Sequence, residues 1–220
     1  MGKINSINNK SGVIEIDPGI SGDSYVQFSI NGTGEFKVGV DDDASDTFKI
    51  SQGSALGAND TFVMSSSGEL TLPLQPSFFN TSSTYYLNVT GDGTYYSIIY
   101  ASSYFDQSSD FDDVSTFTAP TTGTYLIGAG LGNYIDLSGG NEQRISLVTS
   151  NRTYQGGFLP TRVRIANFAG ANNYTGLQIY VLADMDASDT AYAQFMSANG
   201  SKLDDTINNL CTNIFAVLVC

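Results

Sequence analysis

The sequence predicts an all-β protein, and two observations carry that prediction. Thr, Ser, Asn, Tyr and Phe, which favour strands and turns, are frequent, and there are 23 Gly residues. Short alternating segments are separated by turn signals such as NGTG at 31–34 and PTTG at 120–123. Apolar residues make up 41% of the 220 positions, which is enough to bury a core.

The charge balance limits the partners that the chain can be expected to bind. There are 22 acidic residues against 9 basic ones, for a net charge of −13. An acidic surface repels phosphate backbones and anionic lipids, so we expect neither nucleic-acid binding nor membrane insertion. The first residues, MGKINSINNKSG, contain no apolar core of a signal peptide, and the apolar run Ile214–Cys220 is too short to span a bilayer.

Residues 1–21 are predicted to form an N-terminal attachment arm. They are polar except for one short apolar alternation, Val13–Ile16, which is followed by DPG at 17–19. The segment is too short to bury a core, so we expect a small strand that docks onto other proteins.

Residues 22–72 are predicted to form a small β module. Four short strands are expected, at Tyr25–Ile30, Phe36–Val40, Thr47–Ser51 and Thr61–Met64. A thin sheet of four short strands is marginal alone, so this module is expected to need partners.

Residues 73–220 hold the larger predicted domain, whose many short strands indicate a sandwich or jelly roll. The expected strands are Tyr85–Val89, Tyr95–Tyr100, Thr116–Thr118, Thr124–Leu131, Arg144–Thr149, Arg162–Ala166, Leu177–Leu182, Ala191–Met196 and Asn213–Val219. Leu203–Leu210 is the one segment in which a turn or two of helix is expected.

The stretch STFTAPTTGTYLIGAGL at 115–131 combines two strands with a sharp turn. Pro120 cannot donate to a ladder, so the first strand ends there or lies at an edge. Gly123 closes the turn, and side chains alternate beyond it, so Tyr125 is expected to enter a core.

This stretch also carries a family resemblance. The pattern F-T-A-P-x-x-G-x-Y, filled by Phe117–Tyr125, resembles the signature of the complement globular head, within the tumour-necrosis-factor-like superfamily. QPSFFN at 75–80, RISLVTSNRT at 144–153 and TNIFAVLV at 212–219 resemble further strands of that domain, so the likeness covers residues 73–220. At one turn the chain departs from the family, with Ser188-Asp189 in place of Gly-Asp. The resemblance implies a ten-stranded jelly roll that assembles as a homotrimer.

The closing strand supplies a physical reason to expect a trimer. Ile214–Val219 is apolar on both faces, as a strand buried on both sides would be. A threefold axis could cover the second face, and the alternative is a central strand within one sandwich. The candidates for the fold and trimer core are Phe117, Pro120, Gly123, Tyr125, Ile214, Phe215, Val217 and Leu218.

Residues 22–72 resemble a module of bacteriophage tail fibres and other viral fibres, through FKVGVDD, DTFKIS and SSGEL. Together the two resemblances imply a virion protein: a homotrimeric fibre or capsid-decoration protein whose head binds a host receptor, for which a glycan is one candidate. The N-terminal arm would bind other virion proteins. The alternatives are a bacterial secreted or surface binding module and a polysaccharide-degrading spike.

No enzymatic chemistry is predicted. The chain has no His, which excludes Ser-His-Asp catalysis and His-ligated zinc, and its two Cys cannot form a Cys-rich metal site. Three Asp clusters, at 41–46, 110–113 and 184–189, could hold calcium, which some relatives bind at the trimer axis, but Asp also favours turns. No cofactor is therefore expected. Cys211 and Cys220 lie at opposite ends of the last strand and are expected to be free or intermolecular thiols.

Overall fold

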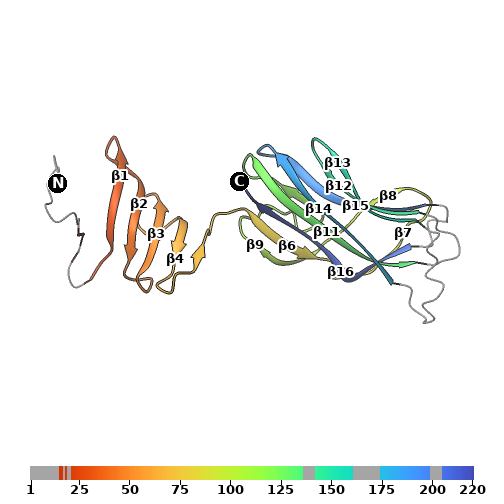
Figure 1. The fold of residues 1–220 in the computed structure, drawn as a ribbon, viewed down its shortest axis with the longest axis horizontal. Coiled ribbons are helices and arrows are strands. Elements are labelled where there is room, and N and C mark those ends of the chain that lie inside the picture. Colours follow the sequence, from red (N-terminus) through yellow and green to blue (C-terminus); the bar gives the residue numbers. More distant parts are fainter. Residues whose placement is uncertain (1–14, 17, 19–20, 136–141, 161–173, 199–204) are drawn as a thin grey trace. The chain divides into compact units, whose positions relative to one another are not determined.

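The computed structural model describes residues 15–16, 18, 21–135, 142–160, 174–198 and 205–220 (Figure 1). All regular structure within these ranges is strand, which confirms the all-β prediction. Across the same ranges no helix is long and apolar enough to cross a membrane. The chain divides into two compact units, Met1–Leu74 and Gln75–Cys220, which we call the small unit and the head unit.

The small unit holds one antiparallel sheet in the order β1-β2-β3-β4-β5. Its strands are β1 (Ser24–Ile30), β2 (Thr33–Asp41), β3 (Thr47–Gln52), β4 (Asp60–Met64) and β5 (Leu70–Thr71). Asn31 and Gly32 join β1 to β2 with φ angles of 53° and 84°, and two successive positive values are what a type I′ hairpin turn requires. The two-residue strand β5 was not expected from the sequence, because so short a segment shows no alternation.

The head unit is a sandwich of two antiparallel sheets that resembles a jelly-roll head (Figure 1). One sheet has the order β14-β11-β16-β6-β9, with β7 paired to β16, and the other has the order β10-β15-β12-β13, with β8 paired to β15. The strands are β6 (Ser77–Thr81), β7 (Tyr86–Thr90), β8 (Tyr95–Ser97), β9 (Ser102–Asp106), β10 (Thr116–Thr118), β11 (Gly123–Ile135), β12 (Glu142–Thr149), β13 (Thr153–Pro160), β14 (Tyr174–Met185), β15 (Thr190–Ala198) and β16 (Asp205–Leu218).

Several expectations about single elements need correction. The helix expected at Leu203–Leu210 is wrong for the described part, because β16 already begins at Asp205 and pairs with β11 and β7. Strands β9 and β13 were missed, and the described head residues hold eleven strands where ten were implied. Glu15 and Ile16 are not in a strand, while the rest of the Val13–Ile16 prediction and all of Arg162–Ala166 lie outside the described residues.

The core of the head unit lies between the two sheets. Strand β11 contributes Tyr125 and Ile127, and the opposite sheet contributes Ile145 and Phe195, all four fully buried. An aromatic group closes one end of this core, with ring centroids 4.8 Å apart for Phe78 and Phe111, 5.3 Å for Phe78 and Phe117, and 5.3 Å for Phe117 and Tyr125. Such offset and edge-on ring pairs stabilise a core beyond the burial of their area.

Candidate self-association surface

The sheet formed by β14, β11, β16, β6 and β9 is apolar on both faces. Its inner face is covered by the second sheet, whereas its outer face is covered by no described residue of the head unit. Alternation along β16 places Ile214 and Ala216 in the core and turns Phe215 and Val217 outward. The outer face is therefore an apolar surface that the described part of the head unit leaves uncovered.

One row of residues crosses this outer face from edge to edge. The strand registers pair Tyr180 with Gly128, Gly128 with Phe215, Phe215 with Phe79, and Phe79 with Phe105. Four of the five members are aromatic, so the row is a band of rings from four strands, with Gly128 on the fifth strand, β11. The bulge residue Tyr104 adds a ring whose centroid lies 5.6 Å from that of Phe79.

A second apolar row runs beside the first. Leu182, Leu126 and Val217 are aligned on β14, β11 and β16. In the isolated chain the exposed fraction of the side chain is 63% for Leu182, 58% for Tyr180 and 53% for Phe105. Neither row contains a charged residue. We call these two rows together with Tyr104 the head face.

Polar residues border the head face on two sides. On one side Gln178, Gly130, Asn213 and Thr81 form the next row across the sheet. On the other side the Asp184 carboxylate accepts a hydrogen bond from the Thr124 hydroxyl at 2.8 Å. An apolar centre with a polar rim is the composition of a protein–protein interface.

Gly128 leaves space above β11 for the rings of Phe215 and Tyr180. A Cβ at this position would stand 2.3 Å from Cε1 of Phe215 and 2.8 Å from Cδ1 of Tyr180. Both distances are far shorter than any real carbon contact, so the two rings occupy the space of the missing side chain.

The structure separates the eight predicted core residues into three groups. Phe117, Tyr125 and Ile214 are buried within one chain, and Leu218 packs against the same core. Phe215 and Val217 belong to the head face. Pro120 is exposed in the turn after β10, and Gly123 begins β11, where a Cβ would lie 2.6 Å from the Cys220 carbonyl oxygen.

Tyr125 explains why the turn at 120–123 is followed by an aromatic residue. Its ring is fully buried, and its hydroxyl donates a 2.8 Å hydrogen bond to the carbonyl oxygen of Thr121 in that turn. Burial raises the pKa of the Tyr125 hydroxyl above its ordinary value. Tyr125 therefore ties the turn to the core and does not reach the head face.

The acidic clusters serve the local backbone. Asp112 accepts hydrogen bonds from the amides of Val114, Ser115 and Thr116 at 2.7–2.9 Å. Asp189 accepts from the Asp186 amide and from the Asn151 side chain. In the described part of the chain no three His, Cys, Asp or Glu side chains converge as a metal site would need. Calcium binding stays a prediction.

The head face includes residues that sequence reasoning did not single out, namely Phe79, Leu126, Tyr180 and Leu182. Alternation in 177–182 and 124–131 was visible, but it cannot tell an inner from an outer face when both are apolar. The sequence did carry one signal of this surface, because Ile214–Val219 is apolar on both faces.

Both cysteines are free and exposed in the structure.

No family model and no curated protein matches the chain. Solved structures similar to it include murine APRIL at pH 8.0, with 9% identity, 66% of this chain and 99% of that chain covered, and a TM-score of 0.44. The globular domain of zebrafish complement 1qA protein shows 10% identity, 66% and 98% coverage, and a TM-score of 0.45. These neighbours are TNF-like and complement-head-like jelly-roll domains. Because both TM-scores lie below 0.5, assembly and function have to be inferred from this chain's own residues.

Proposed function

We propose that the chain is a non-enzymatic structural protein of a virion: a homotrimeric bacteriophage fibre or capsid-decoration protein whose jelly-roll head attaches to the host. The observation that carries the proposal is the head face, a charge-free band of rings across five strands. A contiguous exposed apolar surface that is bordered by polar residues marks an interaction site.

The partner that best suits the head face is another copy of the same chain. At a net charge of −13, two copies repel one another over most of their surface. They can approach closely where both surfaces lack charge, and the head face is such a region. A threefold arrangement follows from the resemblance of residues 73–220 to the complement globular head, and closed symmetry leaves no apolar surface to build open filaments.

Attachment is assigned to the head because a rigid sandwich can display loops toward a receptor. Three linked heads would bind a repetitive cell surface with higher avidity than one. The virion origin rests on the fibre-like segments FKVGVDD, DTFKIS and SSGEL in the small unit. The N-terminal arm, residues 1–21, would then bind other virion proteins.

Native mass under reducing conditions tests the assembly. We expect light scattering to give about 70 kDa, three times the 23.4 kDa of one chain. Tyr180→Glu with Leu182→Glu places two like charges on the head face, and we expect a lower mass or a concentration-dependent one. Gln155→Glu, an exposed position on the opposite sheet, is the matched control and should keep the wild-type mass. A wild-type monomer would contradict the trimer.

Attachment needs its own test. Fluorescently labelled wild-type protein should bind cells of a susceptible host, and the Tyr180→Glu/Leu182→Glu variant should bind more weakly because avidity is lost. Failure of the trimeric wild type to bind any susceptible cell would remove the adhesion role and leave a decoration role. New reducing ends after incubation with host capsule would contradict the non-enzymatic assignment.

A further inference from the structure

The single sheet of the small unit has one polar and one apolar face. Alternation and register place Lys37, Asp41, Lys49 and Ser51 on the polar face. The apolar face consists of three rows across the strands: Phe28 with Phe36; Val26, Val38, Ile50 and Phe62; and Val40, Phe48, Met64 and Leu70. We call the residues of these three rows the small-unit face.

The chain covers the polar face with its own loop. Residues 53–59, between β3 and β4, fold over it, and the buried Leu56 lies in this loop. Lys37 donates a 2.6 Å hydrogen bond to the Gly53 carbonyl oxygen, and the Gly57 amide donates to the Ser51 hydroxyl at 3.0 Å. The loop is therefore held by the polar groups beneath it.

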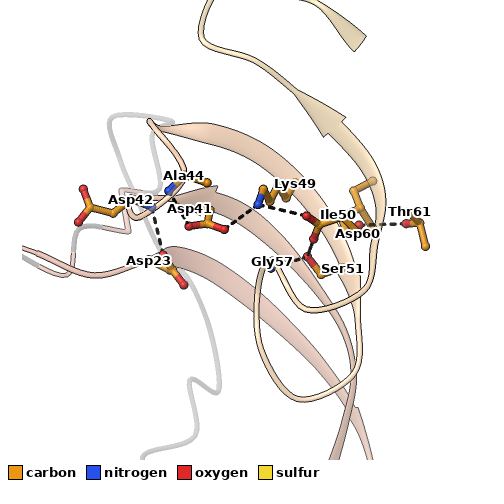
Figure 2. A network of polar contacts seen from close by, with 10 residues as sticks. All are labelled: Asp23, Asp41, Asp42, Ala44, Lys49, Ile50, Ser51, Gly57, Asp60 and Thr61. Atoms are coloured by element: carbon orange, nitrogen blue, oxygen red, sulfur yellow. Dashed lines mark hydrogen bonds and ion pairs between the residues drawn. The ribbon is translucent and has the colours of Figure 1, made fainter. Parts of the chain in front are cut away.

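Figure 2 shows the centre of this polar layer. The Lys49 ammonium lies 2.8 Å from Asp41 Oδ2 and 3.1 Å from Asp60 Oδ2, and Asp60 also accepts a 2.6 Å hydrogen bond from Ser51. The hydrogen bond to Asp41 raises the pKa of Lys49 above its ordinary value, against the effect of burial. Lys49, Asp41 and Asp60 are thus paired with one another, and the Lys37 ammonium is bound by a backbone carbonyl of the same chain.

The small-unit face, in contrast, is left open. The exposed fraction is 56% for Phe28 and 55% for Leu70, and Val26, Phe36, Val40 and Met64 are also exposed. At about half of 150–250 Å² for each of the two aromatic side chains, and somewhat less for each of the four aliphatic ones, these six expose roughly 400–500 Å². That area is somewhat more than half of the roughly 800 Å² that each partner buries in a standard protein interface. The sheet buries Lys37, Asp41 and Lys49 on one face and exposes these apolar side chains on the other, the reverse of the usual arrangement in a monomeric sheet.

We propose that the small unit is a second self-association module, in which the small-unit face packs against the same face of other copies of this chain. A sheet with one apolar face needs a second layer, and an identical sheet supplies one that is equally apolar and equally free of charge. The acidic character of the chain favours contact between copies through uncharged faces. A copy held at the head face also brings its small unit to high effective concentration through the connecting residues 72–76.

The test uses the full chain and separates the two faces. Phe28→Glu with Leu70→Glu changes two exposed positions on the small-unit face. The matched control is Gln27→Glu with Thr71→Glu, which alters the adjacent residues on the opposite face of the same strands. Mass is measured by light scattering from high to low protein concentration, alone and combined with Tyr180→Glu/Leu182→Glu.

We expect the head-face variant to remain associated at high concentration through the small unit, and the combined variant to be a 23.4 kDa monomer. The Gln27→Glu/Thr71→Glu control should keep the wild-type mass. A head-face variant that is monomeric at every concentration would overturn this inference and leave the proposed function intact. Association lost through Phe28→Glu/Leu70→Glu alone would support the inference and count against head-driven assembly.

Hydrogen exchange on the wild-type chain keeps the proposal testable if the variant fails to fold. Amides of β1 and β4 should lose protection on dilution, in step with the fall in mass. Protection that is unchanged between the oligomer and the diluted monomer would show that the small unit is stable alone, and would overturn the inference.

Discussion

The rings of Tyr180 and Phe215 lie with their centroids 6.1 Å apart and their planes at 44°, on strands that are separated by β11. They meet above Gly128, the residue between them in the register. The two rings can touch above β11 because Gly128 has no Cβ to separate them. The aromatic band of the head face therefore depends on one glycine.

Gly128→Ala tests this dependence. The added Cβ would meet Phe215 at 2.3 Å, so at least one ring must move, and we expect a loss of about 1–3 kcal/mol of unfolding free energy. Denaturant unfolding measures the loss. Gly176→Ala on β14 is the control, because its nearest atom would be 3.9 Å away and stability should hardly change. Equal effects at both positions would contradict a specific role of Gly128.

Lys49→Met should destabilise the small unit strongly. It leaves the Asp41 and Asp60 carboxylates without their cation in a buried layer, which costs about 3–5 kcal/mol. Lys37→Met removes a buried cation that hydrogen-bonds a carbonyl and pairs with no described carboxylate, so a smaller cost of about 1.5–3 kcal/mol is expected. Hydrogen exchange in β3 and β4 resolves the small unit from the head. Similar costs for the two variants would contradict the assigned pairing.

Tyr125→Phe isolates the hydrogen bond that ties the turn to the core. The ring stays buried while the bond to Thr121 is lost, so we expect a cost of about 0.5–1.5 kcal/mol. Tyr125→Ala also empties the core position and should cost about 3–5 kcal/mol. Thermal unfolding ranks the variants, and a Phe variant as unstable as the Ala variant would show that the ring contributes little.

Acid should weaken the turn before β10. Burial alone would raise the pKa of Asp112, but the amide hydrogen bonds from Thr116, Ser115 and Val114 outweigh it and lower the pKa below 3.8. Because the pKa of Asp112 is lower in the folded state than in the unfolded state, the ionised carboxylate stabilises the fold above pH 3.8. This contribution is lost as the pH falls through the folded-state pKa. The Tm difference between wild type and Asp112→Asn should therefore shrink from about pH 5 downward. A difference independent of pH would contradict this.

Calcium removal should leave the protein unchanged. Asp112 and Asp189 already accept hydrogen bonds from neighbouring groups, so we expect the same Tm with a chelator as with added calcium. A ligand that binds only the folded state would raise the Tm, and the rise would grow with the logarithm of the ligand concentration above its Kd. A fall in Tm with chelator, reversed by calcium, would show that a cation site exists after all.

The sequence by itself determined the β class, most strands with strong alternation, and the turn at Pro120–Gly123. These features are local: alternation, β-branched and aromatic residues, and turn residues act within a few positions. Strand β10 was predicted with its observed bounds. The errors lie where local preference is weak, as in β5 with two residues, or is overridden by long-range pairing, as at the start of β16.

Only the tertiary structure decided which apolar residues belong to a core and which to a surface. Ile214 and Phe215 are neighbours of similar hydrophobicity, yet one is fully buried and the other faces outward in the ring band. In the small unit, too, only the tertiary structure decided which face is buried. A loop covers Lys37 on one face, whereas Phe28 on the other face is exposed. Local alternation specifies two faces of a strand, but which face is covered depends on packing between segments far apart in the chain.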